Sequence, residues 1–163
     1  MIRGLHHNAY RCRDSEETRR FYEDFLGLKL AGALEITETK TGRRTRVLHT
    51  FYEMGDGSYL AFFDAPEQPF QFKPQHDYDL HIALEVDRAT LARMYAKGKA
   101  EGREVRGVSD HGFVHSIYFR DPNGYVIELT CRTERHDELM DPEKNRARAI
   151  LERWTKTKAE RAA

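Results

Sequence analysis

The chain has 163 residues, which fits one compact domain or two small modules that share a core. Its 27 basic and 27 acidic side chains cancel, so no net field favours nucleic acid as a partner. No apolar run approaches the ~20 residues that cross a bilayer, and the first residues lack the apolar core of a signal peptide. We therefore expect a soluble, cytoplasmic protein that binds neither nucleic acid nor membrane. Cys12 and Cys131 are too few for a disulfide framework and are expected to be buried thiols.

The first half of the chain predicts a strand followed by a helix. Residues 5–12 have strand character, and residues 14–27 carry an apolar stripe at helical spacing. Asp14 or Ser15 can cap this helix, and Gly27 can end it. Three further strands are expected at 28–36, 46–54 and 58–64.

The second half predicts the same order of elements. Residues 80–86 read as a strand, and Asp87 opens a helix that ends near Gly98 or Gly102. Three further strands are expected at 103–108, 113–120 and 124–131. The chain therefore predicts an α+β fold of two tandem βαβββ modules. The predicted boundaries are 1–66 for the first module, 67–78 for a linker, 79–131 for the second module and 132–163 for a C-terminal helical extension.

The two halves also share sequence. HTFYEMGDGSY (49–59) and HSIYFRDPNGY (115–125) superpose at an offset of 66. This alignment pairs His49 with His115, Tyr52 with Tyr118 and Tyr59 with Tyr125. A residue that is present in both halves is better explained by packing than by a site that only one half possesses, which weakens His115 and Tyr118 as functional candidates.

Two other segments predict structure rather than chemistry. Asp121, Pro122 and Gly124 suit a turn between two strands, and no catalytic role is needed for them. Near the C-terminus Asp141 can cap a helix and Pro142 suits its first turn. We expect this helix to pack with one narrow apolar face, made by Ala147, Ile150, Leu151 and Trp154.

Two histidines and one carboxylate occupy strand positions that suit a metal ion. Strand alternation places His7 on one face with Ala9, and His81 on one face with Ala83. Glu128 is a carboxylate within an otherwise apolar strand, and a buried carboxylate needs a partner. A divalent ion bound by these three side chains would supply that partner and keep about three open positions, which suits non-haem iron(II) oxygen chemistry.

The same residues carry a family resemblance. The segments HHNAYRCRDSEETRRFYEDFLGLKL, LHIALEVD and FVHSIYFRDPNGYVIELT resemble the vicinal oxygen chelate superfamily, which includes glyoxalases, fosfomycin-resistance transferases, epimerases and type I extradiol dioxygenases. The resemblance spans about residues 4–131 and leaves 132–163 outside it. It implies βαβββ modules whose curved sheets make a metal-lined cup, with His7, His81 and Glu128 as ligands.

Within this superfamily the residues favour one reaction over others. Glyoxalase-like members carry a further carboxylate at the end of the first module, where this chain has Ala61 or Phe62, depending on the alignment. The lysine-bearing phosphonate-binding pattern of the fosfomycin enzymes is not found either. Tyr118 lies ten residues before Glu128, the spacing at which extradiol dioxygenases place a substrate-binding tyrosine.

The resemblance therefore implies an iron(II)-dependent, extradiol-type ring-cleaving dioxygenase acting on a catechol-like diol. His111 is the expected proton-transfer residue, Tyr118 would orient the substrate, and His115 is a further catalytic candidate. Fe(II) is the expected metal, with Mn(II) and Zn(II) as alternatives. The expected partners are a small aromatic substrate, dioxygen and a second copy of the chain, whose modules pair within one chain or exchange between two.

Two alternatives stay open. One is another metal-dependent member of the superfamily, such as a thiol transferase, a lyase or epimerase, or a glyoxalase-like enzyme. The other is a metal-free protein that sequesters a flat aromatic ligand, as bleomycin-resistance relatives do. Retention of all three ligand types argues against the second alternative.

Overall fold

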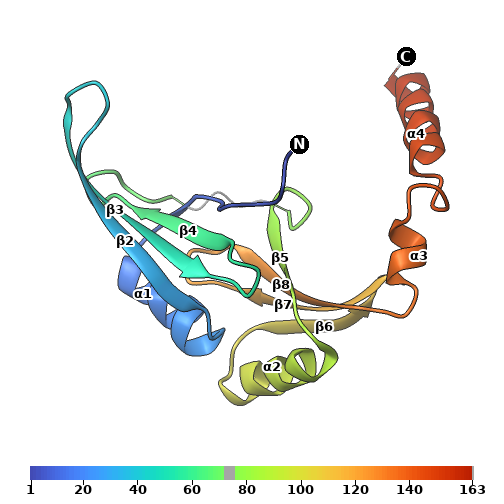
Figure 1. Ribbon diagram of the computed structural model, residues 1–163, viewed down its shortest axis with the longest axis horizontal. Coiled ribbons are helices and arrows are strands. Elements are labelled where there is room, and N and C mark those ends of the chain that lie inside the picture. Colours follow the sequence, from blue (N-terminus) through green and yellow to red (C-terminus); the bar gives the residue numbers. More distant parts are fainter. Residues whose placement is uncertain (72–75, 163) are drawn as a thin grey trace. The chain divides into compact units, whose positions relative to one another are not determined.

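The structure is a computed structural model that describes residues 1–71 and 76–162. It contains two four-stranded sheets, with strand orders β1-β4-β3-β2 and β5-β8-β7-β6 (Figure 1). Along the chain a strand, a helical segment and three strands occur twice, which confirms the predicted α+β fold of two tandem βαβββ modules. Residues 72–75 of the predicted linker lie outside the described residues.

The first module follows its predicted elements closely. Its bounds are β1 Tyr10–Cys12, α1 Ser15–Arg19, η1 Arg20–Phe25, β2 Lys29–Glu38, β3 Arg44–Glu53 and β4 Tyr59–Asp64. The Asp14 carboxylate accepts a hydrogen bond from the Glu17 N–H at 2.8 Å and caps α1 as predicted. The predicted strand 5–12 is wrong in its extent, because β1 is shorter and His7 forms only an isolated parallel bridge with Tyr59.

One face of the first sheet is covered by α1 and η1, which form a single helical segment (Figure 1). Tyr22 of η1 is fully buried and its ring lies 4.7 Å from that of Phe62 and 5.5 Å from that of Tyr52, measured between centroids. Because side chains alternate along a strand, Ala61, next to Phe62 in β4, and His49, three residues before Tyr52 in β3, lie on the opposite face.

The second module also keeps its predicted elements. Its bounds are β5 His81–Glu85, α2 Arg88–Ala100, β6 Val105–Asp110, β7 Val114–Arg120 and β8 Val126–Arg132. The Asp87 carboxylate accepts from the Thr90 N–H at 2.6 Å and caps α2, as predicted. Gly102 adopts a φ of 66° just after this helix, a left-handed conformation that favours glycine.

The chain packs into two compact units that do not coincide with the sequence repeat. One unit is Met1–Ile82 together with Phe119–Ile127, and the other is Ala83–Tyr118 together with Glu128–Ala163. The turn between β7 and β8 therefore belongs to the first unit, although β6 and most of β7 belong to the second. The module boundaries read from the sequence remain a prediction about the repeat.

Buried polar contacts attach this turn to the helix of the first unit. The Asp121 carboxylate is 4% exposed and accepts from the Tyr22 hydroxyl at 2.9 Å, from the Asn123 amide side chain at 3.0 Å and from the Tyr125 N–H at 2.8 Å. The Asn123 side-chain oxygen accepts from the Arg13 N–H at 2.8 Å. The predicted turn is thus also a buried anchor for the ends of β7 and β8.

The hairpin hydrogen bonds place the internal repeat one residue away from the predicted alignment. In the first module the Met54 N–H donates to the Ser58 carbonyl, and in the second the Asp121 N–H donates to the Tyr125 carbonyl, both at 2.9 Å. These equivalent bonds are offset by 67 residues rather than 66. The predicted equivalences of His49 with His115 and of Tyr52 with Tyr118 are therefore wrong, because a one-residue shift moves every side chain to the other face of its strand.

The C-terminal extension differs from its prediction. It forms α3 His136–Met140 and α4 Ala147–Ala162. The Asp141 side chain accepts from the Glu143 N–H and so caps a local turn instead of α4. Arg146, with a φ of 56°, separates this turn from the start of α4. The predicted packed face is exposed instead, with Ile150, Leu151 and Trp154 at 48%, 64% and 66%.

Two other expectations concern the whole chain. In the described ranges, none of the helices combines the length and the apolar character needed to span a membrane. Cys12 and Cys131 are both free and buried, as expected. Burial raises the pKa of the Cys12 thiol to about 11.

The anchor predicts a pH dependence of stability. Burial raises the pKa of Asp121, although hydrogen bonds from Asn123, Tyr125 and Tyr22 oppose the shift. Because the pKa is higher in the folded protein than in the unfolded chain, the linked stability is present at low pH and is lost as pH rises through the folded pKa. The free energy of unfolding of the wild type, relative to Asp121→Asn, should fall as the pH rises above about 4, the ordinary pKa of an aspartate. Urea unfolding at several pH values measures this difference, and a difference that grows with pH would contradict it.

Candidate active site

Glu128 lies on the face of β8 that carries polar side chains. Its neighbours Ile127 and Leu129 face the other way and are 0% and 4% exposed. Glu128 itself is only 7% exposed. Thr130, on the same face as Glu128, accepts a hydrogen bond from the Ser116 hydroxyl of β7 at 3.1 Å, which places Ser116 on this face too.

A short hydrogen-bonded array joins Glu128 to a histidine of the β6–β7 hairpin. The Tyr118 hydroxyl donates to Glu128 Oε1 at 3.3 Å, and His111 Nε2 lies 2.7 Å from the same hydroxyl. All three residues belong to the second compact unit. The structure therefore brings His111, Tyr118 and Glu128 together, although they are separated by 7 and 10 residues.

The directions of these bonds follow from the chemistry of the groups. An ionised carboxylate can only accept, so the Tyr118 hydroxyl gives its proton to the bond with Glu128. The hydroxyl oxygen must then accept from His111, which requires a proton on Nε2. Burial, followed by the charge of Glu128, raises the pKa of Tyr118, so its phenol stays protonated at neutral pH. The array can pass a proton from the imidazolium form of His111 through Tyr118 to the carboxylate.

The backbone around the hairpin fixes this array. The His111 N–H donates to the Val114 carbonyl at 3.0 Å and closes the hairpin. On β6, Gly107 has a φ of 105°, and a Cβ there would lie 2.6 Å from the Ser116 carbonyl oxygen. Only glycine permits this approach between β6 and β7.

His115 does not join the array. It neighbours Ser116 in β7 and therefore points to the face opposite Tyr118. Its Nε2 lies 3.6 Å from a carboxylate oxygen of Asp110. Its predicted catalytic role is without support from this placement.

His7 lies on the face of the first sheet that α1 and η1 leave open. It is exposed, and its ring lies 5.5 Å from that of Phe51 and 6.1 Å from that of His49. His49 is 7% exposed, stacks on Phe63 at 3.8 Å between centroids and donates from Nδ1 to the Phe62 carbonyl at 3.0 Å. In the neutral ring its Nε2 then carries a lone pair. The sequence prediction did not single out His49, because the shifted alignment paired it with His115.

The corrected repeat decides which residue of the first module matches Glu128. At an offset of 67 the counterpart is Ala61, on the same open face as His49, whereas Phe62 packs into the core. A methyl group therefore occupies the position where glyoxalase-like members carry a fourth ligand. The first module can contribute a histidine but no carboxylate at that point.

The predicted metal ligands are divided between the two compact units. His7 lies in the first unit and Glu128 in the second, whereas His81 opens β5 and its Nδ1 lies 3.0 Å from the Asp77 carbonyl. Among residues 1–71 and 76–162, no three His, Cys, Asp or Glu side chains form a group that could hold a metal ion. The donor set of two imidazoles and one carboxylate nevertheless has the chemistry of a divalent-metal site.

Comparisons with known proteins identify relatives of the chain. Residues 4–129 match the family model described as the Glyoxalase/Bleomycin resistance protein/Dioxygenase superfamily. A probable lactoylglutathione lyase of Vibrio parahaemolyticus is 32% identical over 130 residues, which is 76% of this chain and 86% of that protein. The lactoylglutathione lyase of Neisseria meningitidis serogroup A is 30% identical over 142 residues, which is 83% of this chain and 95% of that protein.

Solved structures share the fold at lower identity. A glyoxylase/bleomycin resistance protein/dioxygenase domain from Frankia has a TM-score of 0.65 and 16% identity, covering 84% of this chain and 97% of its own. The fosfomycin resistance protein FosX from Listeria monocytogenes, complexed with Mn(II) and sulfate, has a TM-score of 0.60 and 20% identity, covering 83% and 98%. These similarities support the fold alone.

The relatives correct the predicted reaction. The expectation of an extradiol ring-cleaving dioxygenase is wrong, because the curated relatives are named as lyases. The prediction relied on the ten-residue spacing of Tyr118 and Glu128. In the structure this spacing follows from the hairpin that joins β7 and β8. Two antiparallel neighbours joined by a short turn place such residues side by side whatever the reaction.

The hydrogen bonds predict opposite neutral tautomers for two histidines. In their neutral forms, His111 should carry its proton on Nε2 and His49 on Nδ1. Ring ¹⁵N shifts measured by NMR distinguish the two forms, with His111→Gln and His49→Gln variants for assignment. The same tautomer at both positions would contradict the hydrogen-bond directions given above.

Proposed function

Because the chain belongs to the glyoxalase/bleomycin resistance/dioxygenase superfamily, we propose that it is a metal-dependent lyase that moves a proton on a small substrate with two adjacent oxygens. The observation that carries this proposal is the hydrogen-bonded array of His111, Tyr118 and Glu128. The reaction class follows the relatives, which are named lactoylglutathione lyases. Proton transfer is what a histidine and a phenol in series can perform.

We propose His7, His81 and Glu128 as the ligands of a divalent ion. Neutral imidazoles and a carboxylate suit Mn(II), Zn(II) or Fe(II), and ligand type alone does not choose among them. When bound, such an ion would polarise the substrate oxygens and make an adjacent C–H more acidic. The Mn(II) in the structure of FosX is consistent with this range.

The chain's own residues would then handle the proton. Tyr118 donates to Glu128 Oε1, which orients the carboxylate that would bind the ion. The Tyr118 hydroxyl can donate to a substrate oxygen when that bond is exchanged, and the imidazolium form of His111, protonated on both nitrogens, can return a proton to the phenolate through Nε2 and become neutral imidazole. His115 has no part in this scheme, because it faces the other side of β7.

The open face of the first sheet would hold the rest of the substrate. Phe51 and Phe63 flank His49, and Ala61 leaves room where relatives of the glyoxalase type place a carboxylate. Aromatic rings favour an apolar or planar group. A small substrate with an aromatic part therefore stays our proposal for the ligand.

We propose that two copies of the chain pair to complete the ligand set. The three proposed ligands are divided between the two compact units, with His7 and His81 in the first and Glu128 in the second. Exchange of modules between two copies, which the sequence left open, would bring His7 of one copy to His81 and Glu128 of the other.

The test is a lyase assay on protein stripped of metal and reloaded with Mn(II), Zn(II) or Fe(II). The first substrate is the adduct of methylglyoxal and glutathione, and its conversion to lactoylglutathione is monitored by the absorbance of the thioester. Adducts of aromatic 2-oxoaldehydes are tested next. Glu128→Gln should lower kcat/KM by about 100-fold or more, and Tyr118→Phe should lower kcat by about 10- to 100-fold. Tyr52→Phe is the matched control and should leave turnover unchanged, since Tyr52 is a core residue of the first module.

Two outcomes would refute the lyase proposal. One is a fully loaded protein that forms no thioester and isomerises none of the substrates. The other is consumption of dioxygen that depends on the substrate. Equal activity of Tyr118→Phe and the wild type would remove Tyr118 from the scheme while leaving the lyase reaction in place.

A further inference from the structure

His49 is oriented in the way that metal-binding histidines are. Its Nδ1 donates to the Phe62 carbonyl at 3.0 Å, and its ring stacks on Phe63 with 3.8 Å between centroids and 15° between planes. A histidine that binds a metal usually donates its other nitrogen to a carbonyl or a carboxylate, which fixes both the tautomer and the ring plane. The lone pair of the neutral ring is then on Nε2. His49 therefore presents one oriented nitrogen that could bind an ion.

This nitrogen reaches solvent on the open face of the first sheet. Nδ1 points to the backbone of β4, so Nε2, across the ring, points away from it. Within the described residues His49 Nε2 has no hydrogen-bond partner, and it is not one of the buried side-chain polar atoms that lack a partner. His49 as a whole is 7% exposed, and Nε2 contributes to that exposed fraction.

His7 lies close enough to share an ion with His49. Both residues belong to the first unit, and their ring centroids are 6.1 Å apart. Two imidazoles on one ion, with metal–nitrogen distances of about 2.0–2.1 Å, have centroids about 4.5–6.4 Å apart, depending on the angle at the metal. His7 contacts His6 through Nδ1 at 2.8 Å, so Nε2 is the nitrogen of His7 that can bind.

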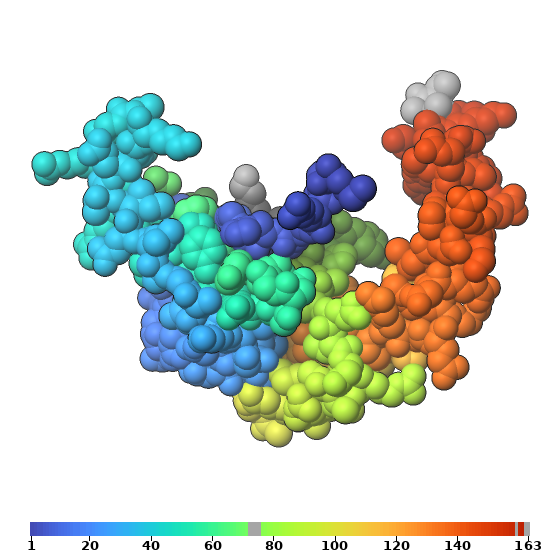
Figure 2. Space-filling model, in the orientation of Figure 1, coloured from blue at the N-terminus to red at the C-terminus, as the bar shows by residue number. Residues whose placement is uncertain are grey.

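The segment that carries His7 can adjust its position toward His49. His7 forms an isolated bridge with Tyr59 and precedes β1, whereas His49 lies within β3. The residues before His7 are largely exposed, and Figure 2 shows the N-terminal segment, in dark blue, at the surface. One imidazole is therefore fixed by the sheet, and the other can move to meet the ion.

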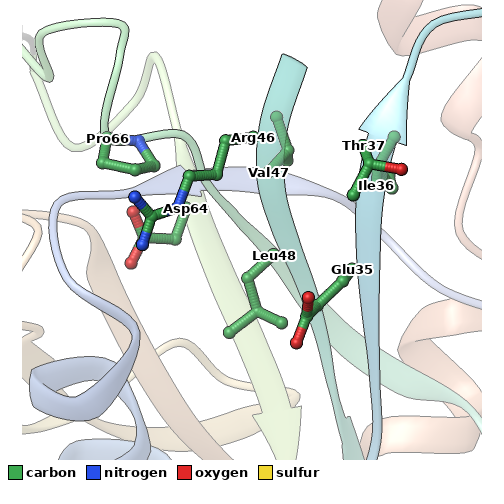
Figure 3. Close-up of a pocket in the computed structure, with 8 residues that line it drawn as sticks. All are labelled: Glu35, Ile36, Thr37, Arg46, Val47, Leu48, Asp64 and Pro66. Carbon is green, nitrogen blue, oxygen red and sulfur yellow. The ribbon is translucent and has the colours of Figure 1, made fainter. Parts of the chain in front are cut away.

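The cavity of the first unit is not a competing cation site. It measures about 270 Å³, and Leu48 and Asp64 of its lining pair in register on the face opposite His49. Asp64 accepts from the Ser15 hydroxyl at 2.8 Å, and Figure 3 shows Arg46 extending toward Asp64. The guanidinium opposes the binding of a second cation there. The lining also includes no histidine.

We propose that His49 is a further ligand of the divalent ion and binds through Nε2 beside His7 of the same chain. Ala61, on the same face, has no side-chain atom that can bind a metal, so the first module would supply two imidazoles. With His81 and Glu128 the ion would have four protein ligands, which leaves about two open positions in an octahedral site. Two positions suit the two adjacent oxygens of the proposed substrate. The inference rests on the metal site of the proposed function and extends it.

The first test follows the ring nitrogens of His49 by ¹⁵N NMR while metal-free protein is titrated with Zn(II). Zn(II) is diamagnetic, and imidazole ligands suit it. The Nε2 signal should move to the position of a metal-bound nitrogen at one equivalent, while Nδ1 keeps the signal of a protonated nitrogen. Ring signals of His49 that stay unchanged in the loaded wild type would overturn the proposal.

A set of variants measures the contribution of His49 to affinity. Asparagine at this position can still donate to the Phe62 carbonyl but has no atom in the place of Nε2. Because loss of an outer-shell partner already costs about 10- to 100-fold, His49→Asn should lower the Zn(II) affinity by about 100-fold or more. His115→Gln controls for the loss of a histidine and Glu35→Gln for binding in the cavity, and both should keep wild-type affinity.

Thermal unfolding separates a ligand from a residue that only packs. Zn(II) should raise the Tm of the wild type above its value in EDTA, because an ion that binds the folded protein stabilises it. In His49→Asn most of this increase should be lost, whatever the Tm of the metal-free variant. A variant whose Tm falls equally with and without Zn(II) would show a packing role and overturn the proposal.

The outcomes distinguish this ligand from the lyase reaction. Zn(II) on His49 Nε2 in a protein that forms no thioester would refute the lyase reaction and leave the ligand in place. Lyase activity with unchanged Zn(II) affinity in His49→Asn would remove His49 from the site and leave the function in place. A wild type that binds no Zn(II) would overturn the ligand together with the metal site.

Discussion

The buried carboxylate of Asp121 joins the turn after β7 to the helix of the first unit. The ring of Tyr22, on that helix, packs against β3 and β4, and its hydroxyl binds Asp121. One residue therefore belongs to both the core and the anchor. A buried carboxylate is costly unless donors surround it, and here side-chain and backbone donors do so. β7 and β8 continue directly from this turn, and they carry Tyr118 and Glu128 just beyond it.

Fixing both strands at one end helps to set the positions of Tyr118 and Glu128 in the array. Tyr118 and Glu128 need only alternation along neighbouring strands to meet, and His111 needs only the hairpin that Gly107 allows. The chemistry is thus placed on strands and one tight hairpin rather than on long loops. Such placement holds polar groups in position before a substrate arrives.

The fold was largely predictable from the sequence, because caps and apolar periodicity are local. Asp14 and Asp87 cap their helices as expected, and each sheet has its predicted strands. The apolar residues of α4 lie on one helical face as predicted, but that face is exposed and not packed. Periodicity says which side chains share a face, whereas burial depends on what lies opposite that face.

The site was predictable only in part, and the register explains the difference. An offset of 66 aligned identical residue types, yet the hairpin hydrogen bonds give 67. Matching identical residue types does not determine which face of a strand a side chain occupies. The sequence prediction therefore overlooked His49 and gave too little weight to Tyr118. The reaction was mistaken for a related reason, because the Tyr118–Glu128 spacing reports hairpin geometry and carries no information on oxygen chemistry.

The direct test of the account is a titration of metal-free protein with Mn(II), with free ion followed by electron paramagnetic resonance. The account predicts one ion for each chain in the wild type, affinity reduced by about 100-fold or more in Glu128→Gln, and near-normal stoichiometry in His115→Gln. Equal Mn(II) affinity in Glu128→Gln and the wild type would contradict the assignment of Glu128, and with it the site built around the Tyr118 array.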